Sequence, residues 1–264
     1  MIGLPKLEFT KDKPCDVCPK GKQSKSSFKL KNIVSTSRPL KLIHMDLFGL
    51  TRVASLGGMH YAYVLVDDYS RFTWVCFFAH KNDAFKAFEN FAKRVQKEKG
   101  FCISSIISDH GTKFENEFFK IFCNENGISH TFSSPRTPQQ NRVVERKNRT
   151  LVEMARIMLH EYNLPLYFWA EAVNTSCYIS NRVFKRPILN KTSYELWNNK
   201  KLKISYLRVF GYKCFILNIK DNLRKFDYKA DEGIFVGYST TIKAYRVFNR
   251  RTLVVEEFMH VVFD

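Results

Sequence analysis

The chain has 264 residues, 45% of them hydrophobic, which is enough to bury the core of one large domain or of a core with a smaller companion. Lys and Arg outnumber Asp and Glu by 43 to 25, and the formal charge of +18 favours polyanionic partners such as nucleic-acid backbones. A membrane surface is the weaker candidate, because no apolar run approaches the roughly 18–20 residues of a transmembrane helix and no signal peptide is visible.

The cysteines predict no disulfide framework, because their number, seven, is odd and the chain shows no export signal. Five lie in apolar runs and are expected to be small core residues: Cys76, Cys102, Cys123, Cys177 and Cys214. Cys15 and Cys18 have the Cys-x-x-Cys spacing of half a zinc site, but zinc needs four ligands and no histidine precedes Cys15. The preferred interpretation is a basic arm with two free thiols, and residues 20–40 read as a linker.

From residue 40 onward, strand-like and helical patterns alternate. The expected elements are strands at 40–48, 60–67 and 72–79, a helix at about 82–99, a strand at 103–109, a helix at about 116–125, a strand at 128–132 and a long helix from 137. The first three strands predict a meander. Asp67 and Asp68 could be ligands, but a turn that ends the second strand is the preferred interpretation. His44 and His80 are expected to be structural.

The sequence pattern changes in the C-terminal third, after an amphipathic helix expected at 164–185. A short helix at 192–197 precedes four β-like runs, at 209–217, 233–238, 244–249 and 253–263, whose regular spacing predicts a small sheet or barrel. This part is basic and interleaved with aromatic residues, namely Lys200, Lys201, Lys203, Lys220, Arg224, Lys225 and Lys229 with Tyr206, Tyr212 and Phe226. DNA or polyprotein contact is one interpretation, and a solvated face is the other.

The long helix carries an acidic residue, Glu145, that the helical period displays. Thr137 can cap this helix, with Pro138 at its first position and Gln140 completing a capping box. One face is an apolar stripe of Val144, Leu151, Ala155 and Met158, and another face holds Asn141, Glu145, Arg149 and Glu153. A solvated amphipathic helix is the alternative interpretation of this pattern.

Two aspartates follow short apolar runs that predict buried strands. Asp46 lies in Leu42-Ile-His-Met-Asp-Leu-Phe48, and Asp109 ends Ile103-Ser-Ser-Ile-Ile-Ser-Asp109 before the turn at His110. Two acids at strand ends and one on a following helix can meet at one edge of a sheet. Counting along the chain, 35 residues separate Asp109 from Glu145.

This triad and its spacing resemble the catalytic signature of retroviral and retrotransposon integrases. Four stretches resemble the copia-type long-terminal-repeat elements, especially those of plants: His44-Met-Asp-Leu-Phe-Gly49, Val66-Asp-Asp-Tyr-Ser-Arg-Phe-Thr-Trp74, Ser133-Ser-Pro-Arg-Thr-Pro-Gln-Gln-Asn141 and Val143-Val-Glu-Arg-Lys-Asn-Arg-Thr150. The resemblance covers nearly the whole chain. It implies a ribonuclease-H-like α/β fold, a mixed five-stranded sheet with flanking helices, plus a small β-rich C-terminal domain.

The resemblance also implies a mechanism and a division into domains. Asp46, Asp109 and Glu145 would hold two Mg²⁺ or Mn²⁺ ions for phosphodiester transfer, since hard divalent ions prefer carboxylate oxygen. The expected domains are 1–35, the tail of a zinc-binding module and a linker; 36–186, the integrase core; and 187–264, the basic β-rich domain. The two histidines of that zinc module would lie upstream, so the chain reads as a fragment of a Pol polyprotein, and zinc binding by it is not expected.

The implied partners are retrotransposon cDNA ends and target DNA, bound by a homo-oligomer that acts in the nucleus after a stage in a cytoplasmic particle. The residues expected to contact DNA surround Glu145: Asn141, Arg142, Arg146, Lys147 and Arg149. Arg142 stands where the family usually has Gly, and Lys113 where it usually has Glu, so strand transfer is expected to be weak or absent. The alternative is a decayed or domesticated remnant that only binds nucleic acid or assembles; a structure-selective nuclease is less favoured.

Overall fold

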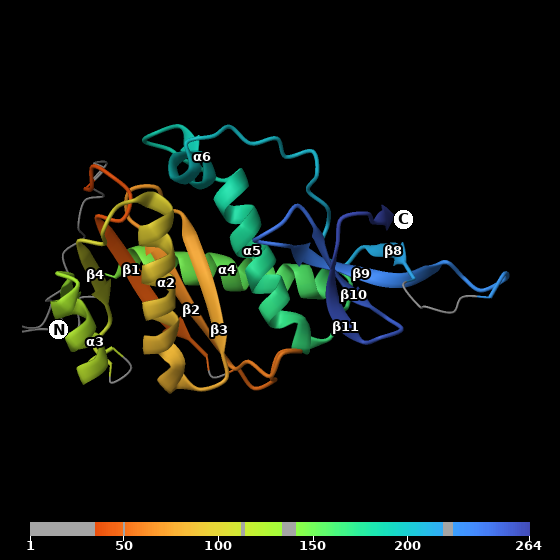
Figure 1. The fold of residues 1–264 in the computed structure, drawn as a ribbon, viewed down its shortest axis with the longest axis horizontal. Helices are drawn as coiled ribbons and strands as arrows, with labels where there is room; N and C mark the ends of the chain where they lie inside the picture. The colour runs from red at the N-terminus through yellow and green to blue at the C-terminus, as the bar shows by residue number, and fades with distance from the viewer. Residues whose placement is uncertain (1–34, 50, 112–113, 134–140, 219–223) are drawn as a thin grey trace, which may run out of the picture. The chain divides into compact units, whose positions relative to one another are not determined.

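The central feature is a five-stranded mixed sheet in the order β3-β2-β1-β4-β5 (Figure 1). Its strands are β1 Leu42–Phe48, β2 Tyr61–Asp67, β3 Thr73–Phe78, β4 Ser105–Ser108 and β5 Ser129–Phe132. The first three strands are antiparallel neighbours, whereas β4 pairs in parallel with both β1 and β5. This topology confirms the predicted meander and the ribonuclease-H-like sheet.

The computed structural model describes residues 35–49, 51–111, 114–133, 141–218 and 224–264. Residues 34–264 form one compact unit. None of the helices in the described ranges is long and apolar enough to cross a membrane.

One face of the sheet is covered by α2 (Ala84–Lys99) and α3 (Glu117–Glu125). The buried side of α2 consists of Ala84, Phe88, Phe91, Ala92 and Val95, and Phe85 is partly buried against the same core. The side chain of Asn116 accepts a hydrogen bond from the Phe119 N–H and caps α3. The apolar residues packed on this face form the largest hydrophobic cluster within the described residues.

The opposite face is covered by α4 (Arg142–Glu161) and α5 (Trp169–Val183), which follows a 3₁₀ turn at Leu166–Phe168. Figure 1 shows α2 in front of the sheet and α4 behind it. The buried residues of α4 recur at three- and four-residue steps and are Val144, Asn148, Leu151, Ala155 and Leu159. The predicted stripe is confirmed at three positions, and Met158 is partly buried.

The start of α4 differs from the prediction. The helix begins at Arg142, and the residue before it, Asn141, makes no side-chain capping bond. The predicted cap, with Thr137, Pro138 and Gln140, lies outside the described residues. Asn141 was expected on the displayed face but is buried.

A second, antiparallel sheet follows in the order β11-β10-β9-β8-β12. Its strands are β8 Lys213–Leu217, β9 Ala230–Tyr238, β10 Tyr245–Asn249, β11 Val254–Phe258 and β12 Val262–Phe263. It packs on α5 at Gly237, where an added Cβ would lie 2.5 Å from the Thr175 hydroxyl oxygen. That hydroxyl donates to the Val236 carbonyl at 2.9 Å, so only glycine allows this approach.

A short hairpin, β6 (Lys185–Arg186) and β7 (Lys191–Thr192), and α6 (Ser193–Asn198) connect the two sheets. Trp197 of α6 is buried against Phe72 and Trp74, with ring centroids 5.5 and 4.7 Å apart. Contacts therefore cross the domain boundary expected between residues 186 and 187. The boundary itself stays a prediction.

The five described cysteines are all free thiols. Cys123, Cys177 and Cys214 are buried, as predicted, and Cys76 is half-buried. The prediction is wrong for Cys102, which is exposed in the segment that leads into β4. Cys15 and Cys18 lie outside the described residues.

Candidate catalytic site

Asp46 and Asp109 lie at the ends of neighbouring parallel strands. In the parallel pairing of β1 with β4, the last paired residues are His44 and Ile107. Asp46 and Asp109 each lie two residues further along, so the same register puts them at the same level. Burial, followed by the nearby Cys76 and the charge of Asp46, raises the pKa of the Tyr63 hydroxyl well above its usual value, and Asp109 adds to the shift. Both carboxylates are therefore close to one buried phenol.

Two hydrogen bonds from described residues hold the carboxylate of Asp46. Its Oδ1 accepts from the Leu47 N–H at 2.9 Å, and its Oδ2 accepts from Nδ2 of Asn148 at 2.7 Å. Asn148 lies in α4, one helical turn after Glu145, so this bond ties the helix to the end of β1. Sequence reasoning missed Asn148, although an amide four residues after Val144 and three before Leu151, inside the apolar stripe, was the available signal.

Glu145 does not join the aspartate pair. It directly follows the buried Val144, about 100° further round the helix, and its side chain is exposed. No group of three or more His, Cys, Asp or Glu side chains within the described ranges could hold a metal ion. The arrangement brings two of the three predicted ligands together, and as it stands it does not fit a complete metal site.

The five candidate DNA-contact residues separate into two groups. Arg142, Arg146 and Arg149 are exposed at successive turns of α4. Asn141 instead points Nδ2 toward the Met45 carbonyl at 3.4 Å, and the ammonium of Lys147 donates to the Ser180 hydroxyl at 3.0 Å. Burial lowers the pKa of Lys147. The expectation that these two face DNA is corrected, because both turn toward the protein interior.

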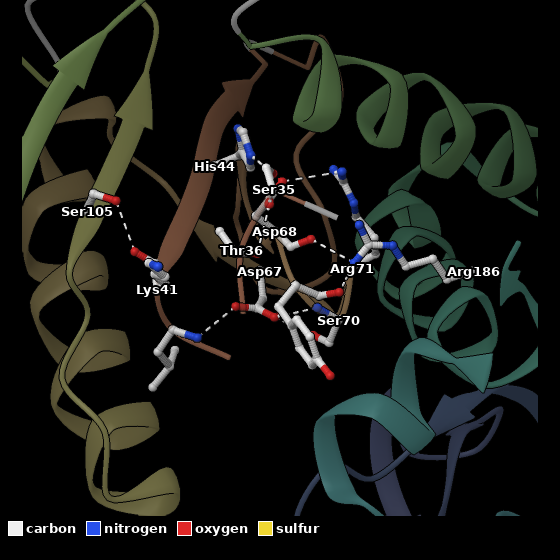
Figure 2. A network of polar contacts seen from close by, with 12 residues as sticks. Ser35, Thr36, Lys41, His44, Asp67, Asp68, Ser70, Arg71, Ser105 and Arg186 are labelled. Carbon is white, nitrogen blue, oxygen red and sulfur yellow. Dashed lines mark hydrogen bonds and ion pairs between the residues drawn. The ribbon is translucent and has the colours of Figure 1, made fainter. Parts of the chain in front are cut away.

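The turn after β2 is a buried polar network rather than a ligand site (Figure 2). Asp67 accepts from the Leu40 N–H at 2.8 Å and from the Ser70 N–H and hydroxyl at 2.7 and 2.6 Å. Burial raises the pKa of Asp67, and these hydrogen bonds offset part of the effect. The predicted strand-ending turn is thereby confirmed.

Asp68 joins three parts of the chain in the same network (Figure 2). One oxygen accepts from the hydroxyls of Ser35 and Thr36 at 2.6 and 2.9 Å, and the other lies 3.1 Å from Nε2 of His44 and 3.3 Å from Arg71. Burial alone would raise the pKa of Asp68, but the hydrogen bonds from His44 and Ser35 and the charge of Arg71 outweigh it. The pKa of Asp68 is therefore held well below its usual range.

The two histidines expected to be structural do not share a setting. His44 is buried and bonded to Asp68, which agrees with the expectation. His80 is exposed and precedes the 3₁₀ turn Lys81–Asp83 that leads into α2. Of the two departures from the family pattern, Arg142 is exposed at the start of α4 and Lys113 lies outside the described residues.

Two domain matches define the class of protein that this fold belongs to. Residues 36–138 match the model of the integrase core domain, and residues 212–264 match that of the retroviral polymerase SH3-like domain. The chain is thus an integrase-type protein, with the acid-bearing ribonuclease-H-like sheet in the first match and the antiparallel sheet in the second.

Relatives of the chain include Pol polyproteins of plant transposons. The chain is 37% identical over 240 residues to the retrovirus-related Pol polyprotein from transposon TNT 1-94 of Nicotiana tabacum, covering 90% of the chain and 18% of that protein. It is 30% identical over 253 residues to that from transposon RE1 of Arabidopsis thaliana, covering 95% and 17%. The chain therefore spans less than a fifth of these relatives.

A solved structure shares the fold at low sequence identity. A chain of the simian T-cell lymphotropic virus intasome, in complex with the PP2A regulatory subunit B56 gamma, superposes with a TM-score of 0.51 and 15% identity. The match covers 79% of this chain and 76% of that one. It supports the fold assignment alone.

Proposed function

We propose that this chain is a polynucleotidyl transferase that processes retrotransposon cDNA ends and joins them to target DNA. The observation that carries the proposal is the pair Asp46 and Asp109, level on parallel strands, with Asn148 tying the Glu145 helix to Asp46. The domain match and the net charge of +18 point the same way. A homo-oligomer acting on paired DNA ends in the nucleus is part of the proposal.

The proposed reaction depends on Mg²⁺ or Mn²⁺ ions, which would stabilise charge on the attacking and leaving oxygens of the phosphodiester. Asp46 and Asp109 would hold a metal ion, as oxygen ligands for a hard cation. A site with all three acids requires the exposed Glu145 side chain to turn toward the pair. The contact of Asn148 with Asp46, one turn further along the same helix, supports this part of the proposal.

A non-enzymatic nucleic-acid-binding or assembly module is the second candidate. It is favoured by the two hydrogen bonds already made by the Asp46 carboxylate and by the exposure of Glu145. Mn²⁺-dependent nicking of a terminal-repeat oligonucleotide separates the two functions. Nicking that disappears in Asp109→Asn supports the transferase, whereas DNA binding with no nicking in either protein supports the module.

Three arginines on α4 are expected to contact DNA phosphates. Replacing Arg142, Arg146 and Arg149 by alanine should reduce the steepness with which DNA affinity falls with salt, by about 0.9 in the log–log slope for each phosphate that is no longer neutralised. Fluorescence anisotropy of labelled duplex DNA across a salt series measures this slope. Arg156→Ala, which removes an exposed arginine further along the same helix, is the matched control. An unchanged slope in the triple variant would place the DNA elsewhere.

Asn148 is expected to act as a positioning residue for Asp46. Asn148→Ala removes the 2.7 Å hydrogen bond to Asp46 and should lower the rate of DNA nicking about 10–100-fold, the range seen when a carboxylate ligand loses its supporting partner. Affinity for DNA should stay constant, because Asn148 is buried. Glu153→Ala, on the exposed side of α4, should leave the rate unchanged. A parallel loss of DNA affinity would contradict the positioning role.

A further inference from the structure

The outer edge of β3 offers unused main-chain groups. The Phe72 and Phe78 carbonyls accept from Asp67 and His60 at the ends of β2, at 3.0 and 3.1 Å, so these residues point their main-chain groups toward that strand. Because such groups alternate in antiparallel pairs, those of Thr73, Val75 and Phe77 point outward. Within the described ranges β3 is an edge strand, and no other described strand pairs with it on this side.

The side chain of Asn181 already pairs with the first outward-facing residue of this edge. Its side-chain amide accepts from the Thr73 N–H at 2.9 Å and donates to the Thr73 carbonyl at 2.8 Å, which are the two bonds that a neighbouring strand would make. The next outward residues, Val75 and Phe77, make no such main-chain bonds within the described part of the chain. Two residues of the edge are therefore available for strand pairing.

A cavity of about 650 Å³ opens along this edge, within the range of ~300–1,000 Å³ typical of ligand sites. It lies between α2 and α5, the helices on either side of β3 in Figure 1, and residues of α6 and of the turn between β9 and β10 line its rim. Asn174 of α5, two helical turns before Asn181, also lines it and makes no hydrogen bond to another described residue through its side chain.

The charges in the cavity are unbalanced. Its two carboxylates are already paired with cations, since Glu171 binds Arg246 at 2.7 and 3.1 Å and Glu98 lies 3.7 Å from the Lys99 ammonium. Glu98 also accepts from Nε1 of Trp197 at 3.0 Å. Arg94 and Arg182 make no ion pair within the described ranges. The Arg182 guanidinium stacks over the Tyr178 ring, with its central carbon 3.4 Å from the centroid. The groove thus presents two uncompensated cations beside open strand edges.

We propose that the β3 edge binds an extended acidic peptide segment as a sixth strand. The main chain of the segment would pair with Val75 and Phe77, and its acidic side chains would meet Arg94 and Arg182. Charge excludes the N-terminal arm as the occupant, because residues 1–34 carry eight lysines against three acids. It also disfavours a second copy paired β3 to β3, which would bring the same arginines together.

The proposal is independent of DNA cleavage and is tested on the wild-type chain. The probe is a fluorescein-labelled synthetic octapeptide of alternating valine and glutamate, and anisotropy measures its binding. The expected result is saturable binding, with slower amide exchange of Val75 and Phe77 by at least about tenfold when the peptide is bound. A peptide N-methylated at its three central residues, which lacks main-chain donors, should not bind.

The charge requirement is tested by reversing it. Arg94→Glu with Arg182→Glu should weaken binding at least about tenfold, corresponding to ~1.4 kcal/mol, and Arg156→Glu, an equal charge change outside the groove, should not. Arg94→Glu alone, at an exposed position, keeps the test valid if the double variant does not fold. Equal binding of the N-methylated peptide, binding unaffected by Arg94→Glu, or unchanged exchange at Val75 and Phe77 would overturn the proposal.

Discussion

Replacing Asp46 by asparagine is expected to lower divalent-metal-dependent DNA nicking at least about 100-fold, because the proposed charge stabilisation amounts to several kcal/mol and each ~1.4 kcal/mol is tenfold in rate. Asp46 lies at the centre of the candidate site, level with Asp109 and bonded to Asn148. An asparagine there keeps the shape and can still accept the bond from Asn148, but it loses the charge that attracts a cation. EDTA should abolish nicking by the wild type.

The control for this variant is an equal change at an exposed acid. Glu153 lies on the outer side of α4. Glu153→Gln should leave the nicking rate unchanged and the free energy of unfolding within about 0.5 kcal/mol of that of the wild type. Urea unfolding of Asp46→Asn verifies that the fold persists. If Asp46→Asn nicks DNA as fast as the wild type does, the reaction does not depend on this carboxylate.

Replacing Asp68 by asparagine is expected to lower the free energy of unfolding by about 3 kcal/mol, the lower end for breaking a buried ion pair, because Arg71 is partly exposed. Asp68 connects the entry of the chain at Ser35 and Thr36 with His44 in β1 and the turn after β2. The amide would keep some of these contacts but would leave Arg71 without its counter-charge. Urea unfolding followed by tryptophan fluorescence gives the difference.

The Asp68 carboxylate should also make the free energy of unfolding depend on pH in the acidic range. Since the pKa of Asp68 is held below its unfolded value of about 3.9, its contribution is complete above that pH and is lost as pH falls toward the folded pKa. Asp67, whose pKa is raised, acts with the opposite sign, so the comparison must be wild type against Asp68→Asn. The difference in unfolding free energy between the wild type and Asp68→Asn should become smaller below about pH 4. A difference that is constant from pH 3 to pH 7 would contradict the assignment.

The order of elements could be predicted from the sequence because the apolar periodicities are local. The stripe of α4 and the apolar runs of the first three strands are each set by residues within one element, and the structure forms the predicted helix and strands there. The exposed Cys102 marks the limit of this reasoning, since an apolar neighbourhood in sequence does not show which side of the segment is covered.

The missed contacts involve amide side chains that reach far along the chain. Asn141, Asn148 and Asn181 bond to Met45, Asp46 and Thr73, partners 96, 102 and 108 residues away. Helical spacing assigned Asn141 to the displayed face because its polarity fits solvent, but the end of β1 offers a buried carbonyl instead. The position of Asn148 inside the apolar stripe did indicate burial, but no local pattern around Asn141 distinguishes a bond to a remote strand from contact with water.

Trp197 has a practical consequence for dissecting the protein. Its indole ring lies beyond the expected end of the catalytic core, yet it packs on Phe72 and Trp74 and gives its N–H to Glu98. A polypeptide ending at residue 186 would uncover these aromatic rings and leave a hollow beside β3. We expect such a shortened polypeptide to be aggregation-prone, and one that extends through α6 to remain in solution.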